Sequence, residues 1–311
     1  MYDVVALGEL LIDFTTQSID SDGYPTMAAH PGGAPANFLA AIAKFGGKAG
    51  MLGKVGTDTF GKLLTNTLRG AGIETKGLVA ADDVFTTLAF VTLDENGDRE
   101  FAFARKPGAD TQLTFDELDL SLIDETRVFH FGTLSLTGEP ARTTTYRAVE
   151  YAKTHGKLVT YDPNLRKPLW RSLDEAKEQM LWGLRQADVV KISDEEVEFL
   201  FGLGVQDGAQ YILDHYPVKL VFVTCGADGC WFQNRNAGGH VDSLKDIKVV
   251  DTTGAGDIFG GSAVWKLLQT GKRPEDLDEA ELTQIVSFAC RAAGLSTTKH
   301  GGISSVPDSI S

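Results

Sequence analysis

The 311-residue chain has only three cysteines, Cys225, Cys230 and Cys290, and they follow no pairing pattern. An odd number of cysteines without a pattern predicts reduced thiols, and it excludes a fold held together by several disulfide bonds. The six histidines are scattered, with no His-x-x-x-His or Cys-x-x-Cys spacing. A structural zinc site is therefore not expected.

Long apolar runs are also missing. No stretch approaches the ~18 apolar residues of a membrane helix. The first residues lack the basic region of a signal peptide, and Glu9 lies where its apolar region would be. These absences predict a cytoplasmic protein that does not enter a membrane.

Positive charge is scarce, since 29 Lys and Arg face 43 Asp and Glu, for a net charge of −14. A field of this sign repels phosphodiester backbones and anionic membranes. Neither nucleic acid nor a membrane is therefore expected as a partner. A local group of donors can still oppose the net charge and bind a small anion.

Short β-branched runs alternate with amphipathic stretches along most of the chain. Buried strands are predicted at 4–7, 128–132, 158–161, 189–192, 220–224 and 247–250. Helices are predicted at 34–45, 58–70, 139–154, 172–186, 194–201, 206–215, 257–270 and 279–294. This alternation predicts an α/β fold, with a doubly wound, mainly parallel sheet and helices on both faces.

Two segments interrupt this alternation. Residues 13–31 are polar and β-like, and residues 85–105 predict a hairpin with strands 86–93 and 99–105 around an Asn96-Gly97 turn. Neither segment can join the main sheet without interrupting its strand order. We therefore expect a small β lid, 13–31 and 85–105, that projects from a large α/β domain. That domain would comprise 1–12, 32–84 and 106–311.

The most informative motif is Asp251-Thr252-Thr253-Gly254-Ala255-Gly256-Asp257, which follows the predicted strand 247–250 and opens a helix. Small residues there let free backbone N–H groups converge on an anion, and the helix dipole favours negative charge. A carboxylate on the first turn suits a general base that deprotonates a hydroxyl attacking a phosphoryl group held by those amides. Glycines alone would equally suit a structural turn, but the whole string favours a functional site.

A second motif, Gly32-Gly33-Ala34-Pro35-Ala36-Asn37, opens another predicted helix. The paired glycines allow a ligand to approach the backbone, and Asn37 offers a donor and an acceptor to a sugar hydroxyl. A loop with a helix cap explains the motif equally well in isolation. Asp13 follows the first strand, at the edge of the sheet where α/β proteins bind ligands.

Together the two motifs resemble the signatures of the ribokinase-like (PfkB) carbohydrate kinases, and the chain is most similar to bacterial fructokinases. The resemblance covers essentially the whole chain, and its second signature is highly specific. It implies a ribokinase-like core, a β-sheet lid, ATP with Mg²⁺, and transfer of the γ-phosphoryl group to a sugar hydroxyl.

The resemblance also implies roles for matching residues. Asp257 would be the catalytic base, and the amides of Gly254, Ala255 and Gly256 would form its anion hole. The sugar contacts would be Asp13, Gly32, Gly33 and Asn37. The ATP contacts would be Ser193, Thr224, Gly226, Gly229 and Gly256.

Two cation sites are implied in the same way. Glu196 would act through water on Mg²⁺, although Ser193 replaces the family's Asn and the pair also forms a helix capping box. A K⁺ ion would bind the main-chain oxygens of Asp251, Thr253, Ser296, Lys299 and Gly301. The loop 298–305 diverges from the ribokinase form, which weakens the K⁺ hypothesis.

Arg105 and Arg166 bear on the identity of the sugar. The string Asp162-Pro163-Asn164-Leu165-Arg166 resembles fructokinases and 2-keto-3-deoxygluconate kinases, and either arginine could bind a substrate carboxylate. We favour phosphorylation of fructose to fructose 6-phosphate, with the keto-acid as the alternative. A dinucleotide-dependent oxidoreductase and a non-catalytic sugar sensor are rival classes. Lid sheets of this family often pair between subunits, so a homodimer through the lid is expected.

Overall fold

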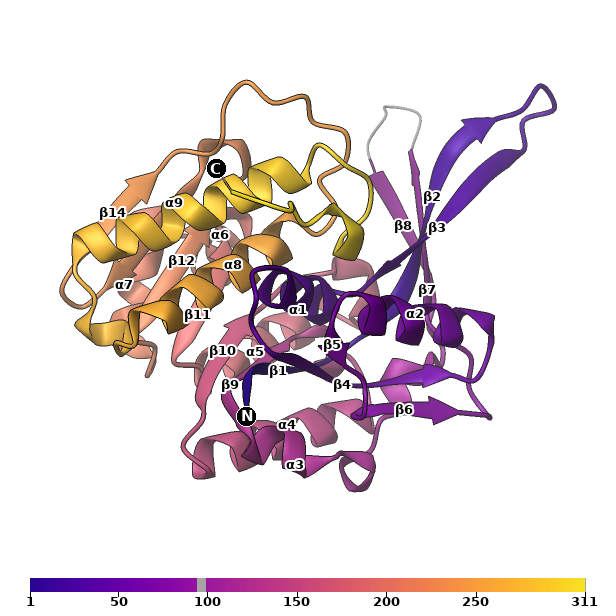
Figure 1. Ribbon diagram of the computed structural model, residues 1–311, viewed down its shortest axis with the longest axis horizontal. Coiled ribbons are helices and arrows are strands. Elements are labelled where there is room, and N and C mark those ends of the chain that lie inside the picture. The colour runs from indigo at the N-terminus through magenta and orange to yellow at the C-terminus, as the bar shows by residue number, and fades with distance from the viewer. Residues whose placement is uncertain (94–98, 311) are drawn as a thin grey trace.

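The computed structural model describes residues 1–93 and 99–310, which form two sheets (Figure 1). The predicted Asn96-Gly97 turn lies outside the described residues. Within the described ranges, no helix is long and apolar enough to cross a membrane.

The larger sheet has ten strands in the order β14-β13-β12-β11-β10-β9-β1-β4-β5, with β6 paired to β4. Its strands are β1 (Tyr2–Leu7), β4 (Ala49–Gly56), β5 (Ile73–Glu74), β6 (Leu78–Ala81), β9 (Thr126–Gly132), β10 (Leu158–Asp162), β11 (Val189–Ser193), β12 (Leu220–Thr224), β13 (Cys230–Asn234) and β14 (Gly238–Val241). All pairings are parallel except β12–β13 and β13–β14. The predicted mainly parallel sheet is confirmed.

Helices cover both faces of this sheet, as predicted. The helices are α1 (Ala34–Lys44), α2 (Thr59–Gly70), α3 (Leu120–Asp124), α4 (Ala141–Thr154), α5 (Leu173–Leu184), α6 (Asp194–Phe201), α7 (Val205–His215), α8 (Ala255–Thr270) and α9 (Glu279–Ser296). Helices α3 to α7 cover one face of the sheet, and α1, α2, α8 and α9 cover the other (Figure 1). The apolar side chains of each group belong to the buried clusters on its own face. Every helix predicted from the sequence is present, and only the short α3 was missed.

The predicted strand 247–250 is wrong. The segment between β14 and α8 is irregular, and the side chains of Val249 and Val250 are 56% and 43% exposed. The backbone N–H groups of Val250 and Asp251 donate to the carbonyl of Thr297, in the turn after α9, and not to a strand. The segment 247–250 is rich in β-branched residues but does not lie beside a sheet edge with which it could pair.

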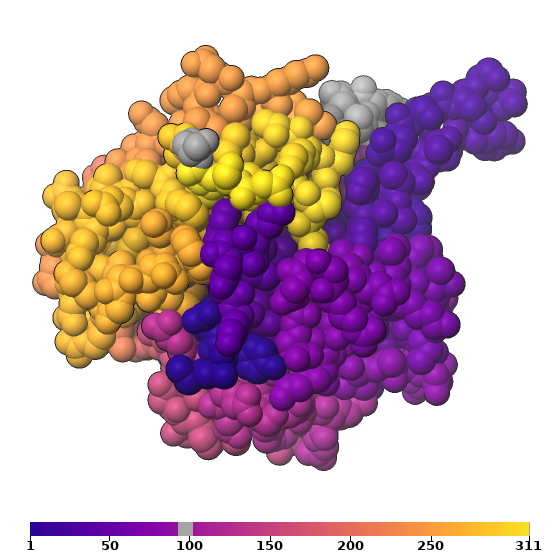
Figure 2. Space-filling model, viewed as in Figure 1, coloured from indigo at the N-terminus to yellow at the C-terminus, as the bar shows by residue number. Residues whose placement is uncertain are grey.

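The smaller sheet has the order β3-β2-β7-β8, from β2 (Leu11–Ile19), β3 (Pro25–Gly32), β7 (Leu88–Leu93) and β8 (Arg99–Ala104). Strand β2 pairs antiparallel with β3 and parallel with β7. The outer part of β2 and β3 projects from the body of the molecule (Figure 2). Strand β2 begins at Leu11, two residues before the expected boundary, and the division into domain and lid stays a prediction.

The base of the small sheet is tied to the larger domain by Asp58. This side chain caps α2 by accepting the N–H groups of Phe60 and Gly61 at 2.8 and 3.0 Å. Its second oxygen accepts both the N–H and the hydroxyl of Thr86, each at 2.9 Å, just before β7. The Asp58 carboxylate therefore holds the start of α2 and the residues just before β7 in one position.

We predict that Asp58→Ala lowers the free energy of unfolding by about 2 kcal/mol, because it removes a helix cap and leaves Thr86 without its partner. Asp278→Ala, at the exposed N-cap of α9, is the matched control and should cost about 1 kcal/mol. Urea unfolding measures both values. Equal losses in the two variants would show that the link between Asp58 and Thr86 adds nothing.

Candidate active site

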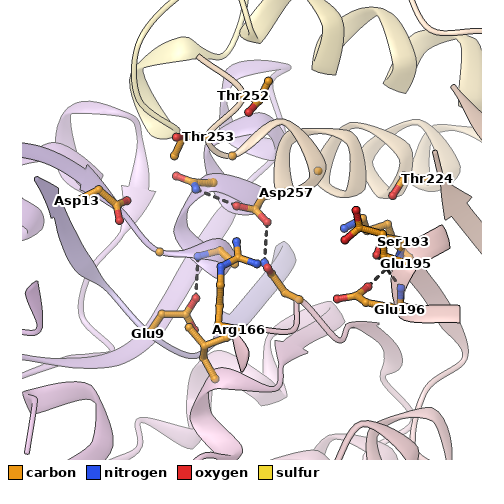
Figure 3. A pocket seen from close by; sticks show the side chains of 18 of the residues that line it. Glu9, Asp13, Arg166, Ser193, Glu195, Glu196, Thr224, Thr252, Thr253 and Asp257 are labelled. Carbon is orange, nitrogen blue, oxygen red and sulfur yellow. Dashed lines mark hydrogen bonds between the residues drawn. The ribbon is translucent and has the colours of Figure 1, made fainter. Parts of the chain in front are cut away.

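A cavity of about 600 Å³ opens where the small sheet meets the carboxyl ends of the central strands. In parallel α/β sheets this edge is where ligands bind. Its lining includes Glu9, Leu11, Asp13, Gly33, Asn37, Val91, Phe103, Leu134, Asn164, Arg166, Lys191, Ser193, Glu196, Thr224, Gly226, Gly254, Gly256 and Asp257. In Figure 3, Asp257 lies between Asp13 on one side and Ser193, Glu196 and Thr224 on the other.

Asp257 is on the first turn of α8 and is buried, with 7% of its surface exposed. Its Oδ2 accepts a hydrogen bond from Asn37 Nδ2 at 2.9 Å, and its Oδ1 accepts one from Asn164 Nδ2 at 3.0 Å. Each carboxylate oxygen is thus held by one amide. Asn37 Oδ1 is buried and has no hydrogen-bond partner among the described residues, and it lies against the backbone of Gly302, where a Cβ would be 2.1 Å away.

The pKa of Asp257 is raised by burial, although the hydrogen bond from Asn37, the charges of Lys191 and Arg166, and the bond from Asn164 all lower it. The carboxyl group is therefore a stronger base than an ordinary aspartate. Such tuning is typical of groups that accept a proton near neutral pH.

Two glycines shape the start of α8. Gly254 has φ +76, and a Cβ there would lie 2.9 Å from the Cα of Gly302. A Cβ on Gly256 would lie 3.0 Å from Lys191 Nζ. Both positions therefore need glycine if the backbone is to approach the loop and the ammonium group, and Ala255 begins the helix between them. The amides that the sequence predicted as an anion hole are at this helix start.

Lys191 is a cavity residue that the sequence analysis missed. Its side chain projects from β11 and forms an ion pair with Asp162 at 3.1 Å. Burial lowers the pKa of Lys191, but Asp162, Glu196 and Asp257 outweigh it and raise that pKa. The ammonium group therefore stays charged and supplies positive charge beside the amides of α8.

The opposite end of the cavity carries Glu9, Asp13 and Gly33. Gly33 has φ +118, and a Cβ there would lie 2.4 Å from the main-chain oxygen of Glu9, so the backbones touch. Gly32 packs against Asp13, because its Cβ would lie 2.4 Å from Asp13 Oδ2. Burial raises the pKa of Asp13 to about 7, partly offset by Arg166.

The two arginines have different positions. Arg166 is exposed and lines the cavity. Arg105 is buried outside the lining, where it donates twice to Asp110, at 2.6 and 2.9 Å, and once each to Thr137 and the carbonyl of Leu134. The structure thus separates Arg105 from the predicted substrate contacts and makes it an anchor of β8.

The residues predicted for nucleotide binding follow β11 and β12. Ser193, Thr224 and Gly226 line the cavity. Gly229 does not: it has φ +96, and a Cβ there would lie 2.0 Å from the carbonyl oxygen of Val241, so the turn itself requires glycine. Gly229 therefore shapes the loop from outside the lining.

Glu196 forms the capping box that its spacing with Ser193 predicts. Its Oε2 accepts the N–H of Ser193 at 2.9 Å, and its Oε1 accepts the N–H of Leu165 at 2.7 Å. Each carboxylate oxygen keeps a further lone pair that water could use. The capping role is observed, and the role toward Mg²⁺ stays a prediction.

The residues predicted to surround K⁺ lie in two adjoining loops. Asp251 accepts the N–H of Thr253 at 2.9 Å and the N–H of Gly301 at 3.1 Å. Ser296 ends α9, and its main-chain oxygen accepts the N–H of Lys299 at 3.2 Å. Within residues 1–93 and 99–310, no three His, Cys, Asp or Glu side chains gather as a metal cluster. A cation here would therefore depend on main-chain oxygens.

Comparison with known proteins places the chain among sugar kinases. The model of the "pfkB family carbohydrate kinase" matches residues 1–309. The chain is 44% identical to "Fructokinase-1" of Zea mays over 308 residues, which cover 98% of this chain and 94% of the maize protein.

Two solved structures resemble the fold closely. Fructokinase from Xylella fastidiosa with bound ATP aligns with a TM-score of 0.90 at 29% identity, covering 99% of this chain and 96% of that one. A double mutant of fructokinase from Vibrio cholerae O395, with fructose, ADP and potassium ion bound, aligns with a TM-score of 0.85 at 31% identity. That alignment covers 98% of this chain and 96% of the other.

Glu9 is a second cavity residue that the sequence analysis missed, and it generates a prediction. It is 2% exposed, and its Oε1 accepts the N–H of Ala34 at 2.8 Å. Burial raises the pKa of Glu9 to about 7. The folded protein therefore binds this proton more tightly than the unfolded chain, whose glutamates titrate near ~4.3. The contribution of protonated Glu9 to the free energy of unfolding is therefore complete below pH ~4.3, the unfolded-chain pKa. It is lost as the pH rises through about 7.

We predict that Glu9→Gln raises the free energy of unfolding at pH 8 by on the order of 2 kcal/mol, because it keeps an acceptor for Ala34 and removes a buried charge. The gain should vanish near pH 4. Denaturant unfolding between pH 4 and pH 8 tests this, and Glu9→Ala, which also removes the acceptor, is the control. A Gln variant whose stability follows the parent's pH dependence would contradict the assignment.

Proposed function

The chain belongs to the pfkB family of carbohydrate kinases, and we propose that it is a fructokinase. It transfers the γ-phosphoryl group of ATP to the primary hydroxyl of fructose and forms fructose 6-phosphate. The observation that carries this proposal is a buried carboxylate, Asp257, held by two amides at the start of a glycine-rich helix inside the cavity. The curated relatives and solved neighbours named fructokinase support the choice of sugar.

The sugar binds between the small sheet and the start of α1. Asp13 accepts hydrogen bonds from sugar hydroxyls, and Asn37 lines the same cavity. Gly33 lines the cavity with backbone alone, so the sugar can approach the main chain there. Val91 and Phe103 of the small sheet line the same space, so the sheet acts as a lid that excludes water as a competing nucleophile.

Asp257 acts as the general base. The ionised carboxylate takes the proton of the primary hydroxyl as the oxygen attacks phosphorus, and the bond from phosphorus to the bridging oxygen of ADP breaks. The first amides of α8 and the ammonium of Lys191 stabilise the charge on the transferring group. Asp257, Lys191, Gly254 and Gly256 all line the cavity, so the fold itself brings these groups together, as preorganised catalysis requires.

ATP lies along the carboxyl ends of β11 and β12, against Ser193, Thr224 and Gly226. The space suits phosphate groups, because the backbone of Gly254 and Gly256 lines it and the side chain of Lys191 there is positively charged. Mg²⁺, when bound, would neutralise phosphate oxygens, with Glu196 placed to hold one of its waters. Main-chain oxygens of Asp251, Thr253, Ser296, Lys299 and Gly301 are proposed to hold K⁺, as the potassium-bound relative suggests. A homodimer paired through the small sheet stays a prediction.

We predict that Asp257→Asn keeps the fold and ATP binding but lowers kcat by ~10² or more, because a positioned base contributes about that much. Asp188→Asn is the control, since Asp188 accepts the N–H of Val159 at the opposite end of the strands. The control should lower stability and leave kcat within a few-fold of the parent. Coupled ADP release and circular dichroism measure these effects, and near-full turnover by the Asp257 variant would remove it from the mechanism.

We predict that fructose gives the highest kcat/KM in an ADP-release assay that also includes 2-keto-3-deoxygluconate, tagatose, ribose and adenosine. Arg166→Gln should reduce keto-acid turnover more than fructose turnover, because a carboxylate forms charge-assisted bonds that a hydroxyl does not. Arg105→Lys should weaken the anchor of β8 without changing the order of substrates. Preference for the keto-acid would overturn the assignment to fructose and leave the kinase class intact.

A further inference from the structure

The turn Asp162-Pro163-Asn164-Leu165 follows β10 and connects groups from three other elements. Asn164 Nδ2 donates to Asp257 Oδ1 on α8 at 3.0 Å. Asp162 pairs with Lys191 on β11 at 3.1 Å, and the N–H of Leu165 donates to Glu196 on α6 at 2.7 Å. The base, the ammonium group and the α6 carboxylate are thus held by one short segment.

Asn164 has an unusual backbone for a residue with a side chain. Its φ is +45, in the left-handed region, and it is 7% exposed. Its N–H donates to Asp162 Oδ1 at 3.1 Å. The same carboxylate pairs with Lys191, so this ion pair also maintains the turn. Asparagine tolerates this conformation better than other side chains, and such outliers concentrate at functional sites.

We propose that Asn164 is a positioning residue for phosphoryl transfer: its side-chain amide fixes the plane of the Asp257 carboxylate and stabilises its charge. The proposal rests on the proposed role of Asp257 as the base. Because Asn37 holds Oδ2 and Asn164 holds Oδ1, the carboxylate cannot rotate without breaking a bond. Only the remaining lone pairs are then available to the incoming hydroxyl.

Asn164 donates twice within the protein. Its backbone N–H donates to Asp162 Oδ1, and its side-chain Nδ2 donates to Asp257 Oδ1. Asn164 therefore acts on the reaction through Asp257, and its loss should affect the base more than sugar binding.

Charged groups on several elements face Asp257. They are Lys191 on β11, Arg166 after β10, Asp162 at the end of β10 and Asp13 on β2. None of these residues is changed by a substitution at position 164. Burial also raises the pKa of Asp13 and of Asp162 to about 7, so a readout specific to Asp257 is needed.

Two variants separate the amide from the backbone. Asn164→Gly accepts the left-handed φ and removes the donor, and Asn164→Asp keeps the shape and replaces the donor with a carboxylate. The titration of Asp257 is followed by carbon-13 NMR of the aspartate carboxyl groups, with its signal assigned by its absence in Asp257→Asn. We expect the pKa of Asp257 to rise in Asn164→Gly and to rise further in Asn164→Asp.

The kinetic measurement is the pH dependence of kcat at saturating fructose and ATP. We expect the acid limb to move upward by about one pH unit in Asn164→Gly, since a bond to a charged group is lost. At pH values well below the midpoint of the acid limb, kcat should fall about tenfold, while KM for ATP changes little.

Asn234→Ala is the matched control. Asn234 is equally buried and donates to the carbonyls of Pro274 and Leu277 at 3.1 and 2.9 Å. It pairs with Leu220, at the end of β12 remote from the cavity. The control should lower thermal stability without moving either titration.

The outcomes distinguish the two proposals. A parent protein without phosphoryl transfer to fructose would overturn the proposed function, and the NMR titration would still decide whether Asn164 stabilises the charge of Asp257. A parent kinase in which both Asn164 variants keep the parent's Asp257 titration and pH profile would overturn the inference alone. A uniform loss of kcat at every pH would also reject it.

Discussion

A buried ion pair below the cavity maintains the arrangement on which the rest of the site depends. The side chains of Lys191 and Asp162 are 12% and 8% exposed, and their charged atoms are 3.1 Å apart. Removing either partner would leave an uncompensated charge in the interior, which typically costs about 3–5 kcal/mol. The pair joins β10 to β11, and the nearby Gly256 lets α8 approach the ammonium group. The two strands and the start of α8 are therefore brought together around one electrostatic contact.

Much of the fold follows from local patterns in the sequence, and the misses have physical causes. The helices were predictable because apolar periodicity and end signals lie within each segment. Strand β4 was missed because Gly50, Gly53 and Gly56 interrupt its β-branched pattern. Glycine is favoured there because a Cβ at Gly50 would lie only 3.3 Å from Val5, and a Cβ at Gly53 only 3.0 Å from the carbonyl oxygen of Gly8. The segment 247–250 is the reverse case: its sequence is typical of a strand, but the segment has no neighbouring strand to pair with and is irregular.

In the candidate site, too, residues within a contiguous motif could be predicted from the sequence, whereas residues that only the fold brings together could not. Asp257 could be predicted because its motif, a glycine-rich helix start with a carboxylate, is contiguous. Lys191 and Glu9 carried no local signal, since a lysine in a strand and a glutamate after one are ordinary until the fold buries them. Arg105, predicted as a substrate contact, lies outside the cavity lining, because its guanidinium group donates to Asp110, only five residues later.

The clamp on Asp257 has a consequence for how this sequence can change over evolutionary time. Asn37 and Asn164 are separated from Asp257 by 220 and 93 positions, so three distant codons encode one chemical unit. Position 164 is the most restricted, because its left-handed backbone favours Gly, Asn or Asp and only Asn among these brings a side-chain donor. Substitutions there are therefore expected to be purged or to require compensation at positions far away in the gene, whereas the exposed neighbour Arg166 can vary with the substrate.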